Sequence, residues 1–318
     1  MAHASVSWGL LLPTREVVMA QGAPDLTKII DLAVQAEASG FDSIWVGDSI
    51  LARPRLEALT TLAAVASRTT RVKLGTAVLL SALRHPVVLA NEAANIDILS
   101  HGRLLLGLGI ATRTPIVERE FTACGVPFGR RLGMFEEGVE IMRRLWTDTH
   151  VTFSGRHFQI QDVSLGLRPM QPGGIPVWLA GAVDTALRRV VRLGDGWFPN
   201  PSSPQAFADL WGRLQTVARE MGRDPTALHR CVYTTLNISA DVAQAAREMR
   251  TFVEGYYGAP YETMARVQGL RSGTAQACAE WLQEFIAAGA QTVVIRFGGP
   301  DQFRQLERCA KEVLPQMR

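Results

Sequence analysis

The chain has 318 residues, 47% of them hydrophobic, and a formal net charge of +3 at pH 7, which suffices for two ordinary domains or one α/β barrel with a large core. The small charge excess, without a basic run, argues against a nucleic-acid partner, and no apolar run is long enough to span a bilayer. The four cysteines lie far apart without a Cys-x-x-Cys pair, so we expect neither a disulfide framework nor a zinc site, and a reducing cytoplasm fits. The histidines are scattered without ligand spacing, so we expect no metal.

Apolar runs and helical patterns alternate along the whole chain. The predicted strands are residues 5–12 and 41–47, two runs within 72–111, and residues 175–180, 194–198, 230–238 and 292–296. The first predicted helix begins at Leu26, and another lies between the two apolar runs of 72–111. Further helices are predicted for residues 56–67, 132–146, 184–193, 204–221 and 274–288, and the last one contains Phe303. Outside this pattern lie a polar loop (112–130), an excursion of short strands and turns (152–167) and a segment without a clear pattern (255–270).

Eight strand–helix units without a composition break predict a parallel sheet covered on both faces. At this length they favour a closed (β/α)₈ TIM barrel, formed as one domain by residues 1–318, over a doubly wound sheet. The dinucleotide-binding fingerprint is missing, because Gly107-Leu108-Gly109 lacks the third glycine.

A barrel carries its site at the carboxyl ends of its strands. The candidates at those ends are Asp48, Ser49, Thr76, Ala77, Val78, Gly109, Ile110, Ala111, Thr112, Ala180, Gly181, Ala182, Trp197, Phe198, Asn237 and Arg296.

Asp48 ends the second predicted strand, where a carboxylate must be solvated or paired. It could accept a hydrogen bond from the ring N–H of a heterocycle. The alternatives are a helix cap or an ion pair with Arg53 or Arg55. Ser49 has no identifiable histidine and acidic partner, so it is no convincing nucleophile.

Two further segments could hold a ligand. Residues 76–78 offer an apolar wall with a few polar edges, which suits a flat ring, although buried barrel packing would look the same. Residues 180–182 precede a helix, whose free N–H groups could bind a phosphate.

Other polar residues are less specific. His85 precedes Pro86 and is expected to position or cap a helix rather than act as an acid or base. Arg53, Arg55 and Arg84 could meet an anionic cofactor tail or belong to a solvated surface.

Four ordered segments carry a family resemblance: GFDSIWVGDS (40–49), the stretch 71–111, PVWLAGA with the RRVVRLGDGWFP that follows it (176–199), and AGAQTVVIRFGGPDQFRQLERCAKEVLP (288–315). With them the chain resembles the luciferase-like monooxygenase superfamily, in particular its branch that depends on the deazaflavin coenzyme F420. The resemblance covers nearly the whole chain. It implies a (β/α)₈ barrel that is usually dimeric.

The resemblance also implies roles for individual residues. Asp48 matches the carboxylate that contacts the deazaflavin ring, and Ala77-Val78 matches a bulge with a cis peptide that backs the ring. Residues 109–112 match the segment along the ring edge and ribityl chain, and residues 180–182 match the phosphate-binding turn. Where many members have a histidine after the acid, this chain has Ser49, and Thr112 stands where some members have a glutamate.

The function that follows from this resemblance is hydride transfer between F420 and a small organic substrate, with Asp48 and Ser49 as the candidate catalytic residues. One alternative is a two-component monooxygenase that uses reduced FMN, with a flavin or F420 reductase as a candidate partner. The other is a catalytically idle flavin-binding barrel. Substrate identity is expected to depend on the segments 112–130, 152–167 and 255–270.

Overall fold

The computed structural model describes residues 6–20 and 23–317, so residue 5 of the first predicted strand lies outside the described part. Eight parallel strands form a closed barrel in the order β1-β2-β3-β4-β7-β8-β9-β11, in which β11 also pairs with β1. The barrel strands are β1 (Ser7–Leu11), β2 (Ser43–Val46), β3 (Lys73–Thr76), β4 (Leu104–Leu108), β7 (Val177–Leu179), β8 (Gly196–Trp197), β9 (His229–Ile238) and β11 (Thr292–Phe297). The predicted (β/α)₈ barrel is confirmed.

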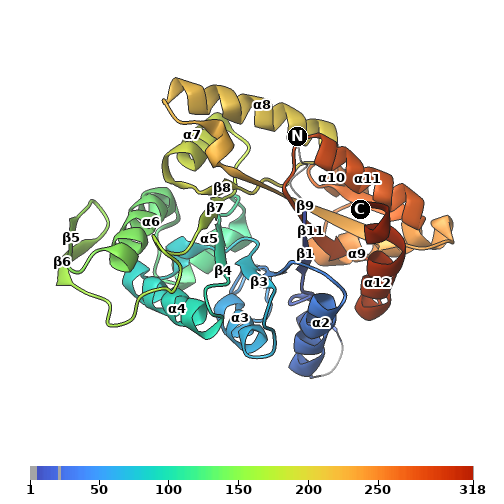
Figure 1. Ribbon diagram of the computed structural model, residues 1–318, viewed down its shortest axis with the longest axis horizontal. Coiled ribbons are helices and arrows are strands. Elements are labelled where there is room, and N and C mark those ends of the chain that lie inside the picture. Colours follow the sequence, from blue (N-terminus) through green and yellow to red (C-terminus); the bar gives the residue numbers. More distant parts are fainter. Residues whose placement is uncertain (1–5, 21–22, 318) are drawn as a thin grey trace.

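Helices surround the barrel in the expected alternation (Figure 1). They are α1 (Glu16–Met19), α2 (Leu26–Ala38), α3 (Ala58–Ala66), α4 (Pro86–Leu99), α5 (Pro115–Ala123), α6 (Arg131–Thr147), α7 (Asp184–Leu193), α8 (Pro204–Glu220), α9 (Val242–Tyr257), α10 (Tyr261–Ala265), α11 (Ala275–Ala287) and α12 (Gln302–Arg308). Shorter turns occupy Ser81–Leu83, Phe128–Arg130 and Pro225–Ala227, and the chain closes with a π-helical segment Cys309–Val313 and a last turn Leu314–Met317. In the part of the chain that the structure describes, no helix has the length and apolarity needed to cross a membrane.

The strands alternate their side chains between two cores. In β2, Ile44 and Val46 face the surrounding helices, whereas Trp45 fills the barrel interior together with Trp178. A Cβ on Gly75 would lie 2.2 Å from the Trp45 ring, so a glycine is required opposite this indole. The barrel is therefore a packed core.

Three segments depart from the simple repeat. The excursion 152–167 forms an antiparallel hairpin, β5 (Val151–Ser154) with β6 (Gln159–Val163), which projects beyond α6 on the left of Figure 1. The expected polar loop 112–130 is partly helical, because Thr114 and Pro115 start α5, and Phe121 on that helix is buried. Strand β10 (Leu270–Gly273) pairs with the second half of β9, beyond the point where the short β8 ends.

Candidate functional site

A cavity of about 620 Å³ opens at the carboxyl ends of the barrel strands. This volume lies in the range of small-molecule and cofactor sites, about 300–1,000 Å³. Residues in or directly after all eight barrel strands line it: Leu11, Asp48, Ser49, Ala77, Val78, Ala111, Thr112, Ala180, Phe198, Tyr233 and Arg296. The structure thus brings most of the predicted site residues to one place.

The side chain of Asp48 is almost fully buried and forms a bidentate ion pair with Arg84. The Arg84 Nη1 and Nη2 atoms donate to Oδ2 and Oδ1 of Asp48 at 2.7 and 3.0 Å, and the Leu80 N–H donates to Oδ2 at 2.9 Å. The side chains of Asp48 and Arg84 are only 2% and 13% exposed. Arg84, rather than Arg53 or Arg55, is therefore the ion-pair partner of this carboxylate.

Arg84 also donates to Glu57 Oε1 at 2.8 Å. Burial lowers the pKa of the Arg84 guanidinium, but the hydrogen bonds and charges of Asp48 and Glu57 outweigh burial and raise this pKa above its ordinary value. Arg84 is thus held between two carboxylates. It braces the end of β2 against the segment that follows β3.

Ser49 is paired with Glu120, a residue of α5 that the sequence did not single out. The Ser49 hydroxyl donates to Glu120 Oε1 at 2.9 Å, and the backbone N–H groups of residues 50–52 donate to the same oxygen at 2.5, 2.7 and 3.2 Å. Glu120 is 1% exposed and lines the cavity. Its Oε2 atom is buried and has no hydrogen-bond partner among the described residues.

The predicted back wall of the site has the expected form. The peptide bond between Ala77 and Val78 is cis, and both residues line the cavity. Thr76 does not reach it, because its hydroxyl donates to the Gly107 carbonyl at 2.8 Å inside the barrel wall. Gly109 lies outside the lining as well, since a Cβ there would approach Val78 Cγ2 to 2.5 Å. Gly109 leaves room for the Val78 side chain.

The edge after β4 has an unusual backbone. Ala111 has a φ of 61°, the left-handed region that a residue with a Cβ rarely adopts. Ala111 and Thr112 line the cavity, whereas Ile110 does not. The Ile110 carbonyl accepts a hydrogen bond from Arg131 Nε at 3.1 Å. Non-glycine residues with this conformation often lie at functional sites.

The turn after β7 ends at a helix without a side-chain cap. No described side chain bonds the first N–H groups of α7, whereas Ser203 caps α8 and Thr274 caps α11. Of the turn residues 180–182, Ala180 lines the cavity, and the Gly181 carbonyl accepts from Trp197 Nε1 at 2.8 Å. The uncapped start of α7 therefore leaves N–H groups for an anion.

Several candidates lie elsewhere. His85 caps α4, with its Nδ1 accepting from the Val87 N–H at 3.4 Å. Trp197 belongs to the outer core, and Asn237 is bonded by Gln305 Nε2 at 2.9 Å. The hairpin β5–β6 supplies no lining residue among those described.

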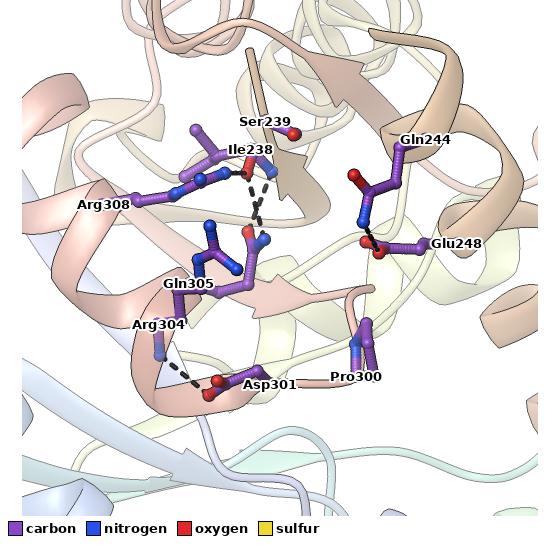
Figure 2. Close-up of a pocket in the computed structure, with 9 residues that line it drawn as sticks. All are labelled: Ile238, Ser239, Gln244, Glu248, Pro300, Asp301, Arg304, Gln305 and Arg308. Carbon is purple, nitrogen blue, oxygen red and sulfur yellow. Dashed lines mark hydrogen bonds between the residues drawn. The ribbon is translucent and has the colours of Figure 1, made fainter. Parts of the chain in front are cut away.

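A second hollow next to α12 is too small for such a ligand. It has a volume of about 70 Å³ and lies at the end of β9 (Figure 2). Figure 2 shows Arg308 and Gln305 bound to the backbone of Ile238, so most polar groups there already have partners.

Comparison with known proteins identifies the family of this chain. Residues 6–305 match the luciferase-like monooxygenase family. An F420-dependent glucose-6-phosphate dehydrogenase of Kineococcus radiotolerans is 30% identical, over 92% of this chain and 93% of its own. Two solved structures share the fold at 20% identity: an F420-dependent secondary alcohol dehydrogenase in complex with an F420-acetone adduct (TM-score 0.83, 99% of both chains) and a monooxygenase from Streptomyces bottropensis (TM-score 0.81, 98% and 100%). The chain belongs to the luciferase-like monooxygenase family.

Proposed function

We propose that this protein is an F420-dependent oxidoreductase that transfers hydride between the deazaflavin and a small organic substrate. The observation that carries the proposal is the cavity of about 620 Å³ at the carboxyl end of the barrel, with the apolar wall of residues 77–78 and the Asp48 carboxylate in its lining. The name of the 30% identical relative supports the choice of F420 over FMN.

The residues present fit this cofactor. The apolar face of Ala77-Val78 suits one side of a flat ring, and the edge at residues 111–112 suits its rim. The uncapped start of α7 after residues 180–182 suits the phosphate. Asp48 accepts three hydrogen bonds, and a carboxylate has about four acceptor positions, so one remains for a ring N–H.

When bound, F420 supplies or accepts a hydride at C5 of its ring. The chain's own contribution is to bind this ring, to exclude water from its apolar side and to handle the proton of the substrate. We assign the proton to the Ser49–Glu120 pair. Glu120 Oε1 is saturated by donors, so a proton taken up by this carboxylate goes to Oε2.

The test is a titration of the purified protein with F420 and with FMN, followed by turnover with candidate alcohols, monitored by the visible absorbance of F420. We expect tight F420 binding and substrate-dependent bleaching of that absorbance. FMN binding without F420 affinity, together with oxygen consumption when reduced FMN is supplied, would overturn the proposal in favour of a two-component monooxygenase.

A homodimer, a reductase that regenerates the reduced cofactor and a cytoplasmic location belong to the same proposal. All four cysteines are free, which fits a reducing compartment. Sedimentation analysis of the purified chain tests the dimer.

A further inference from the structure

Arg296 is a fully buried cation at the mouth of the barrel. It lies near the end of β11, on the same strand face as Val294, and is 2% exposed. Its Nε donates to Thr235 Oγ1 at 3.1 Å, its Nη1 to the Tyr257 hydroxyl at 3.0 Å and its Nη2 to Gln268 Oε1 at 3.5 Å. All three acceptors are neutral. A guanidinium has five N–H donors, so two have no partner in the described part of the chain.

Other buried arginines of this chain show what a purely structural role looks like. Arg103 makes five hydrogen bonds, to main-chain carbonyls and to the Thr69 hydroxyl. Arg189 is paired with Glu136 at 2.8 Å. Arg296 has neither arrangement. Arg103 has five hydrogen bonds and Arg189 has an acidic partner, whereas Arg296 is buried with two N–H donors that have no partner among the described residues. A buried charge with unpartnered donors is costly, and such groups concentrate at functional sites.

Aromatic rings partly stabilise the buried charge of Arg296. The Arg296 guanidinium carbon lies 4.6–5.4 Å from the ring centroids of Tyr233, Phe252, Tyr256 and Tyr257. Rings stabilise a cation without neutralising it. Tyr233, Tyr257 and Gln268 line the same cavity as Arg296, so the cation belongs to the cavity wall.

A second guanidinium reaches the same end of the barrel. Arg55 lies against Gly47 at the end of β2, since a Cβ added to Gly47 would be only 2.1 Å from the Nη1 atom of Arg55. Arg55 lines the cavity, and its Nε donates to the Arg53 carbonyl at 3.2 Å. The described residues give neither Arg55 nor Arg296 an ion-pair partner within 4.0 Å.

The local charge is positive. The acidic group that faces the cluster is Glu16, whose pKa is raised by burial and lowered by the charges of Arg296 and Arg55. Burial and the charges of Arg55 and Arg53 lower the pKa of Arg15, and the buried Arg15 Nη1 has no partner among the described residues. Two further carboxylates, those of Asp48 and Glu120, line the same cavity. Asp48 is paired with Arg84, and Glu120 accepts from residues 49–52. Neither is therefore an ion-pair partner of Arg55 or Arg296.

This cluster lies across the barrel from the turn that suits the cofactor phosphate. Residues 180–182 directly follow β7, which in the closed order stands four strands from β1, whereas β2 and β11 flank β1. A phosphate at the start of α7 would therefore lie on the far side of the barrel from Arg55 and Arg296 and would pair with neither.

We propose that Arg296 and Arg55 form an anion subsite on the substrate side of the cavity, which binds a carboxylate or phosphate group of the substrate. Both oxyanions match the planar fork of a guanidinium. The assignment to substrate rests on the proposed cofactor position. Two of the present partners of Arg296, Tyr257 and Gln268, belong to the segment between β9 and β10. When the anion binds, it replaces these two residues as hydrogen-bond acceptors of the guanidinium.

The test is calorimetric titration of the cofactor-free protein with inorganic phosphate and, separately, with acetate. We expect saturable binding of at least one anion, weakened at least tenfold in Arg296→Met and in Arg55→Met. The matched control is Arg188→Met, which removes an exposed arginine paired with Glu220. If Arg296→Met does not fold, Arg296→Lys and Arg55→Met carry the test.

The two anions distinguish a phosphate ester from a carboxylic acid as the substrate class. F420 affinity, measured on the same variants, is expected to stay within twofold of the unmodified protein. Absence of anion binding, or wild-type binding in both variants, overturns the inference. An equal loss of F420 affinity also overturns it, because the cluster would then hold the cofactor tail. If anions bind but F420 does not, the anion site stands, whereas the proposed cofactor fails together with the assignment of the site to the substrate.

Discussion

Ser49 and Glu120 lie 71 residues apart in the sequence, and their side chains meet at 2.9 Å in the cavity wall. The substitution Glu120→Gln keeps an acceptor oxygen but removes the second carboxylate oxygen. If Glu120 takes the substrate proton, kcat should fall by about 10²-fold or more. The readout is the pH profile of kcat, in which the acidic limb should disappear, because a base acts only while it is deprotonated.

Glu137 is the matched control for this experiment. Its carboxylate also accepts consecutive backbone N–H groups, those of residues 156–158 at 2.9–3.0 Å, but it lies outside the cavity lining. Glu137→Gln should lower the free energy of unfolding by about 1–3 kcal/mol and leave kcat unchanged. Equal kcat losses in both variants would contradict the proton role.

The Asp48–Arg84 pair should contribute to stability as well as to the site. Asp48→Ala leaves a largely buried guanidinium with Glu57 as its remaining partner and frees the Leu80 N–H. We expect a loss of about 3 kcal/mol in the free energy of unfolding, measured by urea denaturation. In the Asp48→Ala background, the further substitution Arg84→Met should lower the free energy of unfolding much less than Arg84→Met does alone. Strict additivity would show that the pair is not coupled.

Gly109→Ala tests whether the face of Val78 belongs to the cofactor site. The added Cβ would lie 2.5 Å from Val78 Cγ2 and must displace that side chain. The expected loss of F420 affinity is about tenfold, the lower part of the range for overpacking. Gly212→Ala is the control, because nothing lies within 4 Å of its added Cβ on α8. It should stabilise the fold by about 0.5–1 kcal/mol and leave F420 affinity unchanged.

His229 should make the fold sensitive to mild acid. It stacks on Trp178 at 4.5 Å, and burial, with the charge of Arg230, lowers its pKa from 6.5 to about 4. Between these values the unfolded chain binds more protons, so stability is fully present above pH 6.5 and is lost as the pH falls toward 4, by about 3 kcal/mol in total.

Thermal unfolding at several pH values should therefore show a shallower pH dependence for His229→Gln than for the unmodified protein. Exposed His150, beside Asp162, provides the control variant His150→Gln. The explanation fails if the pH dependence of His229→Gln parallels that of the control.

The sequence predicted the barrel well because its strands are buried on both sides. Such strands appear as continuous apolar runs, and each ends in a turn that is easily recognised. Helix α5 was missed because Thr114 and Pro115, which start it, also suit a loop. Strand β10 was missed because its half-buried residues, such as Arg271 and Ser272, carry no alternating pattern.

The site was predicted where backbone defines it and missed where side chains meet over long sequence distances. The cis peptide at Ala77-Val78 followed from the family resemblance and is confirmed. The contacts of Glu120 with residues 49–52 could not be predicted, because a glutamate in a polar stretch gives no sign that it is buried. Arg296 was a candidate because it lies at a strand end. Its neutral partners could not be predicted, because they lie 28 to 61 residues away in the sequence.

The pairing of β10 with β9 has an evolutionary meaning. The Ser239 N–H donates to the Gly273 carbonyl at 2.8 Å, so the segment between them leaves and rejoins the barrel wall at one hydrogen bond. The segment between these two residues, which includes Tyr257 and Gln268, could therefore be replaced by another one without breaking the pairing of the eight barrel strands. A relative could acquire a new substrate by replacing that segment, while the closed ladder of barrel strands and the cavity wall at residues 77–78 stay as they are.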